Sequence, residues 1–570
     1  MSHLKDDPEV STEPTSTEVS RRGFLKGVGS TGAVAAATSL GLGSLAAPEA
    51  ALAEEIGPQG QIARRLAAYT VRNKAALYYL TAPLSLQPSN TDEQLYADKR
   101  ASYSKGLDSN ELGEPTASAY QSLRDALSSG DPADFEAIEL YSPNPFQFQT
   151  CPQGSLAFEM FGIDSHAGRI EPFPAFVSNH NAALMGEVYW QCISRDVPFN
   201  HYDTDTLIGA AVDDLDTSFS FKIGPTTGGH ITPGTIFRGP WSGCLAGPHV
   251  SQFLWLPIPY GQQLIHQQFP VPVEGADYGT TYADWLSIQR DEAPDSSLAF
   301  QGDRYIYSMR AGGEWVHRDF AFQGPLNAAL ILFLRYGTAA LADSNPYKTS
   351  LSQNGFVTFS LPGISHLVAM AGDAALKAAW FQKWLVHRRL RPEALAGRVE
   401  NQTNGSKNYG LHPDLVDSDA VSYLLSTNGT ALLPLAFPEG SPTHPAYPAG
   451  HATFSAAGAT ICKAFYKEDF VIPDPVVSND DGTALDDWTG EDLTVLGELN
   501  KLVANISLFR DGAGVHYRAD GEQGNLLGEQ VAIGILRDYS RSYNESFTGF
   551  TLTKFNGQKI LIKNGNVSNV

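Results

Sequence analysis

Residues 441–452 read SPTHPAYPAGHA, and they decide how the rest of the chain is interpreted. Their three prolines lack a backbone donor and clash with a preceding helical turn, so the stretch is predicted to be a rigid loop. The loop is expected to end near Gly450 and to lead into an alanine-rich helix over Ala452–Phe465. Free N–H groups and the positive dipole end make such a helix start an anion site. His444 and His451 could exchange protons with the bound anion. The alternative is a proline-braced turn with two surface histidines.

A second segment, Trp380 to Pro392, reads WFQKWLVHRRLRP and lies at the end of a helix predicted over Leu361–Arg389. Lys383 and Arg391 are eight residues apart, which is about two turns of a helix. The proline is expected to fix where the chain leaves that helix. The alternative is a basic, solvated helix face whose arginines complement the negative end of the helix dipole.

The third segment, residues 510–520, reads RDGAGVHYRAD. Its two glycines let the backbone approach another group closely. If the chain is helical from His516, Asp520 lies four residues further on, where it can accept a hydrogen bond from the imidazole and orient it. The alternative is a glycine turn before a capped helix.

Together the three segments supply Lys383, Arg391 and Arg510 as fixed cations beside His516. A tetrahedral trianion such as phosphate or vanadate needs about three cations to be neutralised in a pocket of low dielectric. Arginine also presents a planar fork that matches its oxygens. The combination therefore predicts an oxyanion site.

The N-terminus carries an export pattern. Residues 20–26 read SRRGFLK, a weakly apolar Gly/Ala run follows, and Ala51-Leu52-Ala53 fits a small-residue cleavage site. This pattern is typical of a twin-arginine signal peptide over residues 1–53, with the mature chain spanning residues 54–570 in the periplasm or outside the cell. No other run of 18 apolar residues follows, so no membrane span is expected after processing.

Composition limits the class of partner. A net charge of −23 over 570 residues argues against nucleic acid, because phosphate backbones repel such a surface. The four cysteines are widely scattered and form no C-x-x-C pair, which leaves one or two disulfides or buried free thiols open.

Apolar periodicity predicts a mainly α-helical fold packed as bundles. An Asn-Gly pair inside residues 551–562 predicts a C-terminal β-hairpin. Residues 223–260 are rich in Gly, Pro and aromatics and are expected to form a lid, a channel wall, an oligomer contact or a plain surface excursion. Besides those named above, helices are predicted over residues 62–80, 117–127, 134–140, 182–196, 326–340, 491–510 and 520–540.

The order Lys-x7-Arg-Pro, Pro-x-Gly-His and Arg-x5-His-x3-Asp resembles the vanadium-dependent haloperoxidases, a superfamily that also contains acid phosphatases. The Lys383–Arg391 spacing, Trp380 and the phrase around His444 are similar to the algal-type bromoperoxidase branch. Residues 247–254, GPHVSQFL, also look like a family segment.

The resemblance implies an all-α fold of two four-helix bundles in one compact domain, with vanadate bound by the half spanning about residues 326–545. It assigns the equatorial vanadate oxygens to Lys383, Arg391, Arg510 and the amide of Gly450, and the vanadium ligand to His516. His451 becomes the proton-exchanging histidine. The resemblance places His444 and Trp380 beside the halide and Asp520 behind the ligand.

The implied reaction oxidises halide, bromide first, with hydrogen peroxide to hypohalous acid, which halogenates a small organic acceptor. The catalytic residues would be His451, His444 and Lys383. A homodimer or larger homo-oligomer is implied, and a structural calcium ion without assigned ligands. Two alternatives stay open: an acid phosphatase that uses His516 as its nucleophile, and a degenerate oxyanion-binding relative.

One position departs from the family pattern. Family members commonly have serine in Pro-Ser-Gly-His, whereas this chain has Ala449. A hydroxyl that donates to a charged acceptor contributes about 1.5–3 kcal/mol, so its loss is expected to weaken vanadate binding. A water could fill the gap if there is room for one.

Overall fold

The computed structural model describes residues 60–570, and residues 73–570 form one compact unit. The signal peptide predicted over residues 1–53 lies outside the described residues. Within the part that is described, none of the helices combines the length and the apolar character that a bilayer crossing needs.

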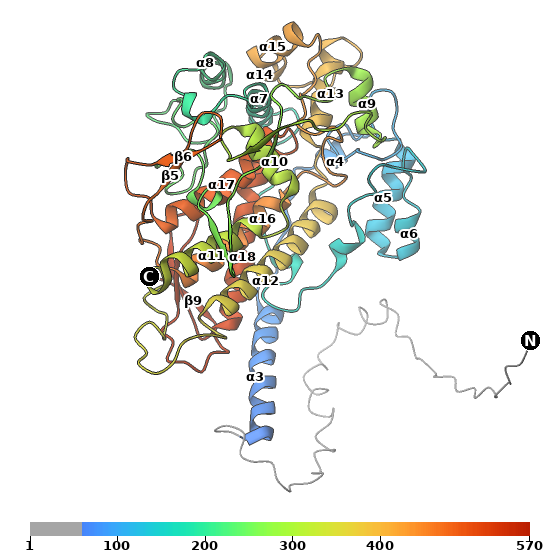
Figure 1. The fold of residues 1–570 in the computed structure, drawn as a ribbon. Helices are drawn as coiled ribbons and strands as arrows, with labels where there is room; N and C mark the ends of the chain where they lie inside the picture. The colour runs from blue at the N-terminus through green and yellow to red at the C-terminus, as the bar shows by residue number, and fades with distance from the viewer. Residues whose placement is uncertain (1–59) are drawn as a thin grey trace, which may run out of the picture. The chain divides into compact units, whose positions relative to one another are not determined.

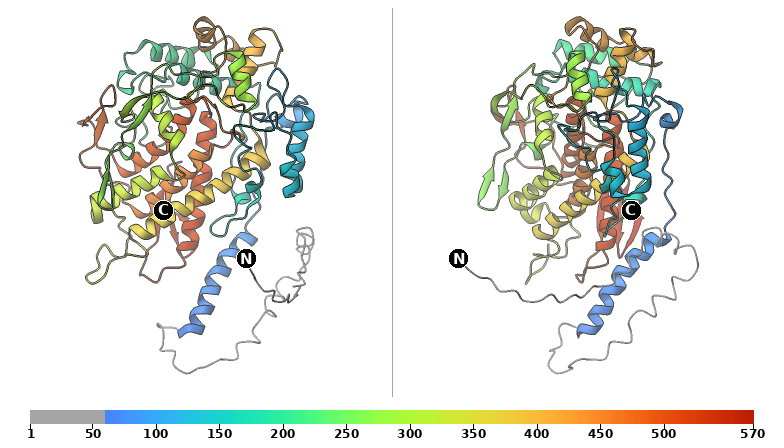
Figure 2. Two further views of the ribbon diagram at one scale, coloured as in Figure 1. Left: turned by 45° about the vertical axis from the view of Figure 1, so that its right-hand side comes forward. Right: turned by 90° about the vertical axis from the view of Figure 1, so that its right-hand side faces the viewer.

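Four long helices form a bundle at the centre of this unit, where they lie side by side in all views (Figures 1 and 2). The helices are α12 (Leu361–Phe381), α16 (Gly450–Phe465), α17 (Val495–Gly512) and α18 (Arg518–Tyr539). Almost every residue of α16 is buried, because α12, α17 and α18 all pack on it and α11 (Gln323–Tyr336) adds a further contact. A helix apolar on every side is stable only inside such a bundle.

Glycines allow α16 and α18 to approach closely. An added Cβ at Gly528 of α18 would lie 2.1 Å from the Thr453 carbonyl oxygen of α16. At Gly524, one turn earlier, it would lie 2.9 Å from the Ala449 carbonyl oxygen. The start of α16 is therefore held against α18 at the distance that glycine permits.

A second helical group is centred on α7 (Asn179–Ile193), which packs on α17 as well as on α8, α14 and α15. The prediction of a mainly helical protein is confirmed, with small antiparallel strand pairs at its periphery. The remaining α-helices are α3 (Gly60–Thr81), α4 (Asp92–Leu95), α5 (Ala117–Ser129), α6 (Pro132–Glu136), α8 (Thr206–Asp213), α9 (Tyr282–Gln289), α10 (Met309–Arg318), α13 (Pro392–Thr403), α14 (Pro413–Val416) and α15 (Asp419–Thr427).

The strands form three two-stranded pairs and one three-stranded sheet within the described residues. The predicted C-terminal hairpin is present as β7 and β8, paired from Phe550↔Ile562 to Thr553↔Lys559. A third strand, β9, extends it on the β8 side, which the sequence analysis missed. The strands are β1 (Ile258–Tyr260), β2 (Gln263–Ile265), β3 (Phe269–Pro272), β4 (Phe300–Arg304), β5 (Val476–Ser478), β6 (Leu485–Asp487), β7 (Phe550–Thr553), β8 (Lys559–Lys563) and β9 (Asn566–Asn569).

One predicted helix was wrong at its end. The helix expected over Leu361–Arg389 changes to a π-helix over Gln382–His387 and stops at Arg388, which is left-handed (φ 46°). Pro392 does not mark the helix exit. It is the first residue of a new helix, α13, where a proline costs no hydrogen bond. Lys383 and Arg391 therefore do not share a helix face.

The four cysteines are free thiols; Cys192, Cys244 and Cys462 are buried, whereas Cys151 is exposed.

The close α16–α18 contact yields a stability prediction. Gly528→Ala should lower the free energy of unfolding by about 1–3 kcal/mol, because its Cβ overlaps a backbone carbonyl that cannot move aside. Gly209→Ala in α8 is the matched control, since its Cβ would meet nothing within 4 Å. There alanine should stabilise by about 0.5–1 kcal/mol. Urea unfolding of both variants checks the pair, and an unchanged midpoint for Gly528→Ala would contradict the packing.

Candidate functional site

The three segments singled out in the sequence meet in the structure. Residues 383–391 lie against residues 444–446, because the Ala446 amide donates to the Arg389 carbonyl oxygen at 3.1 Å. The Lys383 ammonium donates to the Pro445 and Ala446 carbonyl oxygens at 2.7 and 2.8 Å. Lys383 is fully buried and comes from the π-helix, so its position depends on the distorted end of α12.

Arg391 connects all three segments. Its guanidinium donates through Nε to the His444 carbonyl oxygen (2.8 Å) and through Nη1 to the Val515 carbonyl oxygen (2.7 Å). The Nη1 atom also lies 3.1 Å from Nε2 of His516, and Nη2 lies 2.9 Å from Nδ1 of His444. Arg391 is 1% exposed, and it caps the start of α13.

His516 has a defined tautomer. Its Nδ1 lies 2.9 Å from Oδ2 of Asp520, so Nδ1 carries the proton and Nε2 keeps a lone pair. Arg389 holds the other carboxylate oxygen of Asp520 at 2.8 Å. Burial first, and then Arg391, Lys383 and Arg510, hold the pKa of His516 well below its ordinary value. The sequence analysis considered a helix that begins at His516, whereas α18 begins two residues later at Arg518. The predicted contact with Asp520 forms nevertheless.

The start of α16 adds the helix N-terminus. Gly450 is its first residue, and an added Cβ there would lie 3.1 Å from the Trp380 ring. Ala449 is the N-cap and contributes no side-chain hydrogen bond, so the first N–H groups of this helix stay available to a ligand. His451 follows, and its Nε2 lies 3.0 Å from Oδ1 of Asp319.

His444 and Trp380 pack against each other, with ring centroids 4.8 Å apart. Burial and the neighbouring charges of Arg391 and Lys383 lower the pKa of His444 well below its ordinary value. The imidazole is therefore neutral at physiological pH. The Trp380 indole donates to the Thr150 carbonyl oxygen at 3.1 Å, which fixes the wall of the site beside His444.

The site concentrates positive charge. Burial, followed by Arg391, lowers the pKa of Arg510 to about 10, and burial lowers that of Arg391 to about 10. Burial first, with Arg391 and Arg510, holds the pKa of Lys383 well below its usual range. The Arg510 guanidinium donates to the Val316 carbonyl oxygen at 2.9 Å, while its buried Nε has no partner. Each of these three buried cations makes it harder to charge the other two, and Arg510 has an N–H donor without a partner. Such a site fits a multiply charged oxyanion.

All nine predicted site residues belong to this one constellation. Two further residues, Asp319 and Arg389, were missed as functional residues. Arg389 lies in the quoted basic segment, yet its role depends on a partner 131 positions away. Asp319 lies in no motif and is recognised only through its contact with His451.

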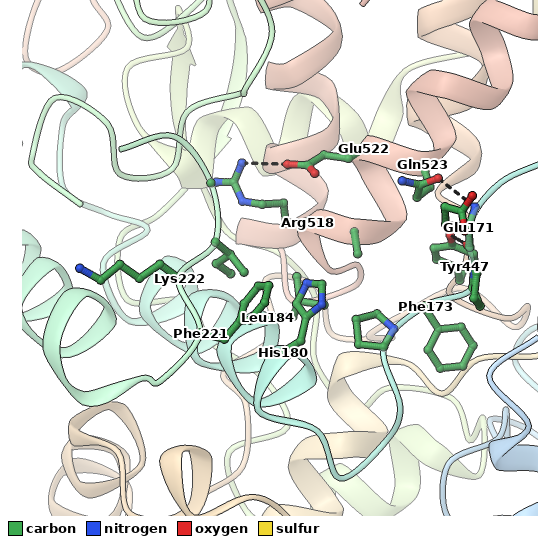
Figure 3. A pocket seen from close by; sticks show the side chains of 15 residues that line it. Glu171, Phe173, His180, Leu184, Phe221, Lys222, Tyr447, Arg518, Glu522 and Gln523 are labelled. Atoms are coloured by element: carbon green, nitrogen blue, oxygen red, sulfur yellow. Dashed lines mark hydrogen bonds and ion pairs between the residues drawn. The ribbon is translucent and has the colours of Figure 1, made fainter. Parts of the chain in front are cut away.

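A separate cavity of about 370 Å³ opens nearby, and Figure 3 shows its lining. Tyr447 reaches it from residues 441–449, the loop before α16, which we call the active-site loop, and Arg518 and Glu522 form an ion pair on its wall. None of the nine predicted site residues lines this cavity, so it is distinct from the oxyanion site.

Among the described residues, no group of three or more His, Cys, Asp or Glu side chains converges as a metal site would require. Calcium therefore stays a prediction without assigned ligands.

Comparisons with known proteins agree with the geometry. Residues 364–545 match the model of the VCPO second helical-bundle domain. A vanadium-dependent bromoperoxidase of Ascophyllum nodosum is 32% identical over 485 residues, which cover 81% of this chain and 86% of that protein. The vanadium-dependent bromoperoxidase of Corallina officinalis is 31% identical over 477 residues, 71% of this chain and 78% of that protein.

A solved structure agrees as well. The second vanadate-dependent bromoperoxidase of Ascophyllum nodosum (AnII), a homohexamer, superposes with a TM-score of 0.86 and 27% identity, over 94% of this chain and 96% of that one. The shared length, the helical fold and the convergence of the three motifs on one site lead to one conclusion: this chain belongs to the vanadium-dependent bromoperoxidase family.

Proposed function

We propose that the protein is a vanadate-dependent haloperoxidase that oxidises bromide with hydrogen peroxide to hypobromous acid, which then halogenates a small organic acceptor. The observation that carries this proposal is the gathering of the Lys383, Arg391 and Arg510 charges around His516, whose Nε2 lies 3.1 Å from Nη1 of Arg391. The names of its relatives support it, since they are bromoperoxidases rather than phosphatases.

The residues present fit vanadate. Lys383, Arg391, Arg510 and the amide of Gly450 would hold its oxygens, and Nε2 of His516 would ligate the vanadium. Bound vanadate supplies a Lewis-acid centre that activates hydrogen peroxide without a change of oxidation state. Asp520 keeps the proton on Nδ1 of His516, so Nε2 carries the lone pair, which accepts from Arg391 here and would ligate the vanadium.

His451 is the proton acceptor. Its Nε2–H is directed to Asp319, which leaves Nδ1 as the ring atom that can take a proton from peroxide. Burial lowers the pKa of His451, the Asp319 carboxylate opposes that shift, and Arg510 adds to it. The imidazole is thus neutral and basic at rest, while Asp319 stabilises the imidazolium once it forms.

His444 and Trp380 form the wall on which bromide would lie. Their rings present an apolar surface, and a neutral His444 adds no full charge. A weakly hydrated anion is favoured there by the nearby cations rather than by a dedicated ion pair.

The decisive experiment is bromination of a phenol-type dye with peroxide and bromide, run on apoprotein and after addition of orthovanadate. We expect activity only with orthovanadate, and suppression by excess phosphate, because both oxyanions compete for the same cations. His516→Ala should lose vanadate-dependent activity while remaining folded. If the protein does not brominate the dye but hydrolyses phosphate esters, the result would instead support the acid phosphatase. If it binds neither vanadate nor phosphate, the result would support the degenerate relative.

Ala449 at the N-cap of α16 generates a second prediction. Ala449→Ser should tighten orthovanadate binding by on the order of tenfold, because a hydroxyl donated to a charged acceptor contributes about 1.5–3 kcal/mol. Ala459→Ser, further along the same buried helix, is the control and should leave the Kd unchanged. An equal Kd for Ala449→Ser and the parent protein, measured by titration of orthovanadate, would refute a role for the missing hydroxyl.

The N-terminal pattern supports export by the twin-arginine route to the periplasm or the extracellular space. Replacing both Arg21 and Arg22 by Lys should trap the chain in the cytoplasm of a bacterial host with that route. Cell fractionation checks this, and undiminished export of the double variant would contradict it. Because the AnII relative is a homohexamer, we also expect the mature chain to assemble as a homo-oligomer.

A further inference from the structure

The C-terminal end of α10 contacts the site through two nearby residues. The Val316 carbonyl oxygen accepts the hydrogen bond of Arg510 at 2.9 Å. Asp319, the residue after the helix, holds Nε2 of His451 at 3.0 Å. The second carboxylate oxygen of Asp319 is buried without a partner, so the course of the backbone decides where this carboxylate lies. A shift of this helix end would therefore displace an oxyanion-binding cation and the carboxylate behind the proton acceptor together.

His317 lies between these two residues and is clamped on both ring nitrogens. Its Nδ1 lies 3.1 Å from Oε2 of Glu314, one turn earlier on α10, and its Nε2 lies 2.7 Å from Oε1 of Glu439. The ring also stacks on Phe437, with centroids 3.7 Å apart and planes 12° from parallel. Since the side chain is only 14% exposed, the clamp is largely shielded from solvent.

Glu439 lies two residues before the start of the active-site loop, and it belongs to a wider network. The Lys105 ammonium donates to the Glu439 carbonyl oxygen at 2.6 Å and pairs with Oε1 of Glu393 at 3.1 Å. The other oxygen of Glu393 accepts the Ser441 amide at 2.6 Å. Because Glu393 lies two residues after Arg391, the network joins the loop to both α10 and α13.

We propose that His317 is a positioning residue for the reaction: by bridging Glu314 and Glu439, it fixes the end of α10 on the active-site loop and so places Asp319 behind His451. This role rests on the proposed function, because it serves the proton acceptor of that reaction. It assigns to a half-buried histidine, whose contacts are otherwise unexplained, the task of holding two segments in register.

The bridge depends on protonation. Both ring nitrogens can donate to carboxylates only as imidazolium. Burial lowers the pKa of His317, but Glu314 and Glu439 outweigh that effect, so its pKa is raised. The charged groups around it include Arg318, which pairs with Glu314 at 3.3 Å, Lys105 behind Glu439, and Arg510, whose charge also interacts with Glu439. A raised pKa means that the bridge is complete below the ordinary histidine pKa and is lost as pH rises through the raised value.

The test compares His317→Gln with the parent protein, both loaded with orthovanadate. Glutamine can contact one carboxylate but cannot bridge two as a cation. We expect kcat to fall about tenfold, with the KM values for bromide and peroxide within about threefold, as for a misplaced catalytic group. The alkaline decline of activity that titrates with His317 should also disappear. His201→Gln, which removes an exposed histidine paired with Asp480 at 3.1 Å, should change neither quantity. An unaltered kcat and pH profile in His317→Gln would overturn the proposal.

A double-mutant cycle and hydrogen exchange separate this proposal from the proposed function. If His317 and Glu439 act as one clamp, the double variant His317→Gln/Glu439→Gln should lose no more kcat than the worse of the two single variants. Exchange measured by mass spectrometry over residues 433–449 should speed up in His317→Gln and not in His201→Gln, even in a preparation with no bromination activity. If the parent protein shows no bromination and exchange is still faster in His317→Gln than in the parent, the proposed function is refuted and the clamp is supported. If the losses of kcat in the two single variants add up in the double variant and hydrogen exchange is unchanged in His317→Gln, the clamp alone is refuted.

Discussion

The structure depends on keeping three like charges buried at one place. Lys383, Arg391 and Arg510 are 0–3% exposed, and each would repel the others in a medium of low dielectric. Main-chain carbonyl oxygens of residues 316, 444, 445, 446 and 515 accept their hydrogen bonds and reduce this cost without cancelling the charge. The surplus positive potential is what an oxyanion would neutralise. Those carbonyls lie in α10, in the loop before α16 and in the turn between α17 and α18, so the packing of these elements holds them in place.

The carboxylates around the site each have a defined task. Asp520 fixes the tautomer of His516 and is itself held by Arg389, whereas Asp319 pairs with His451. Burial raises the pKa of Asp520, and the pull of Arg389 and Lys383 opposes that rise. The negative charges thus lie behind the two histidines, and the cations are left to face a bound anion. This segregation of charge is the electrostatic basis of the proposed chemistry.

The types of the site residues could be predicted from the sequence, whereas the path of the backbone between them could not. Residue types predicted the cations, the helix N-terminus and the histidines of an oxyanion site, and the family resemblance added Trp380 and the individual roles. The spacing argument for Lys383 and Arg391 was wrong in its geometry, because a π-helix and the left-handed Arg388 end the helix between them. Distortion of this kind follows from tertiary packing and leaves no periodic trace in the sequence. Asp319 was missed because its only functional contact spans 132 positions.

The sequence by itself determined the helical class, a helix within residues 450–465, the C-terminal hairpin and the three segments that meet at the candidate site. Each of these follows from local properties: apolar period, proline placement, an Asn-Gly turn and side-chain chemistry. The tertiary structure alone decided how α16 packs on α18, where α12 breaks, and which carboxylates reach which histidines. Those outcomes depend on glycines whose missing Cβ matters only against a partner helix, and on ion pairs between residues more than a hundred positions apart. No local rule encodes such pairs, because burial and distance create their energies only once the chain is folded.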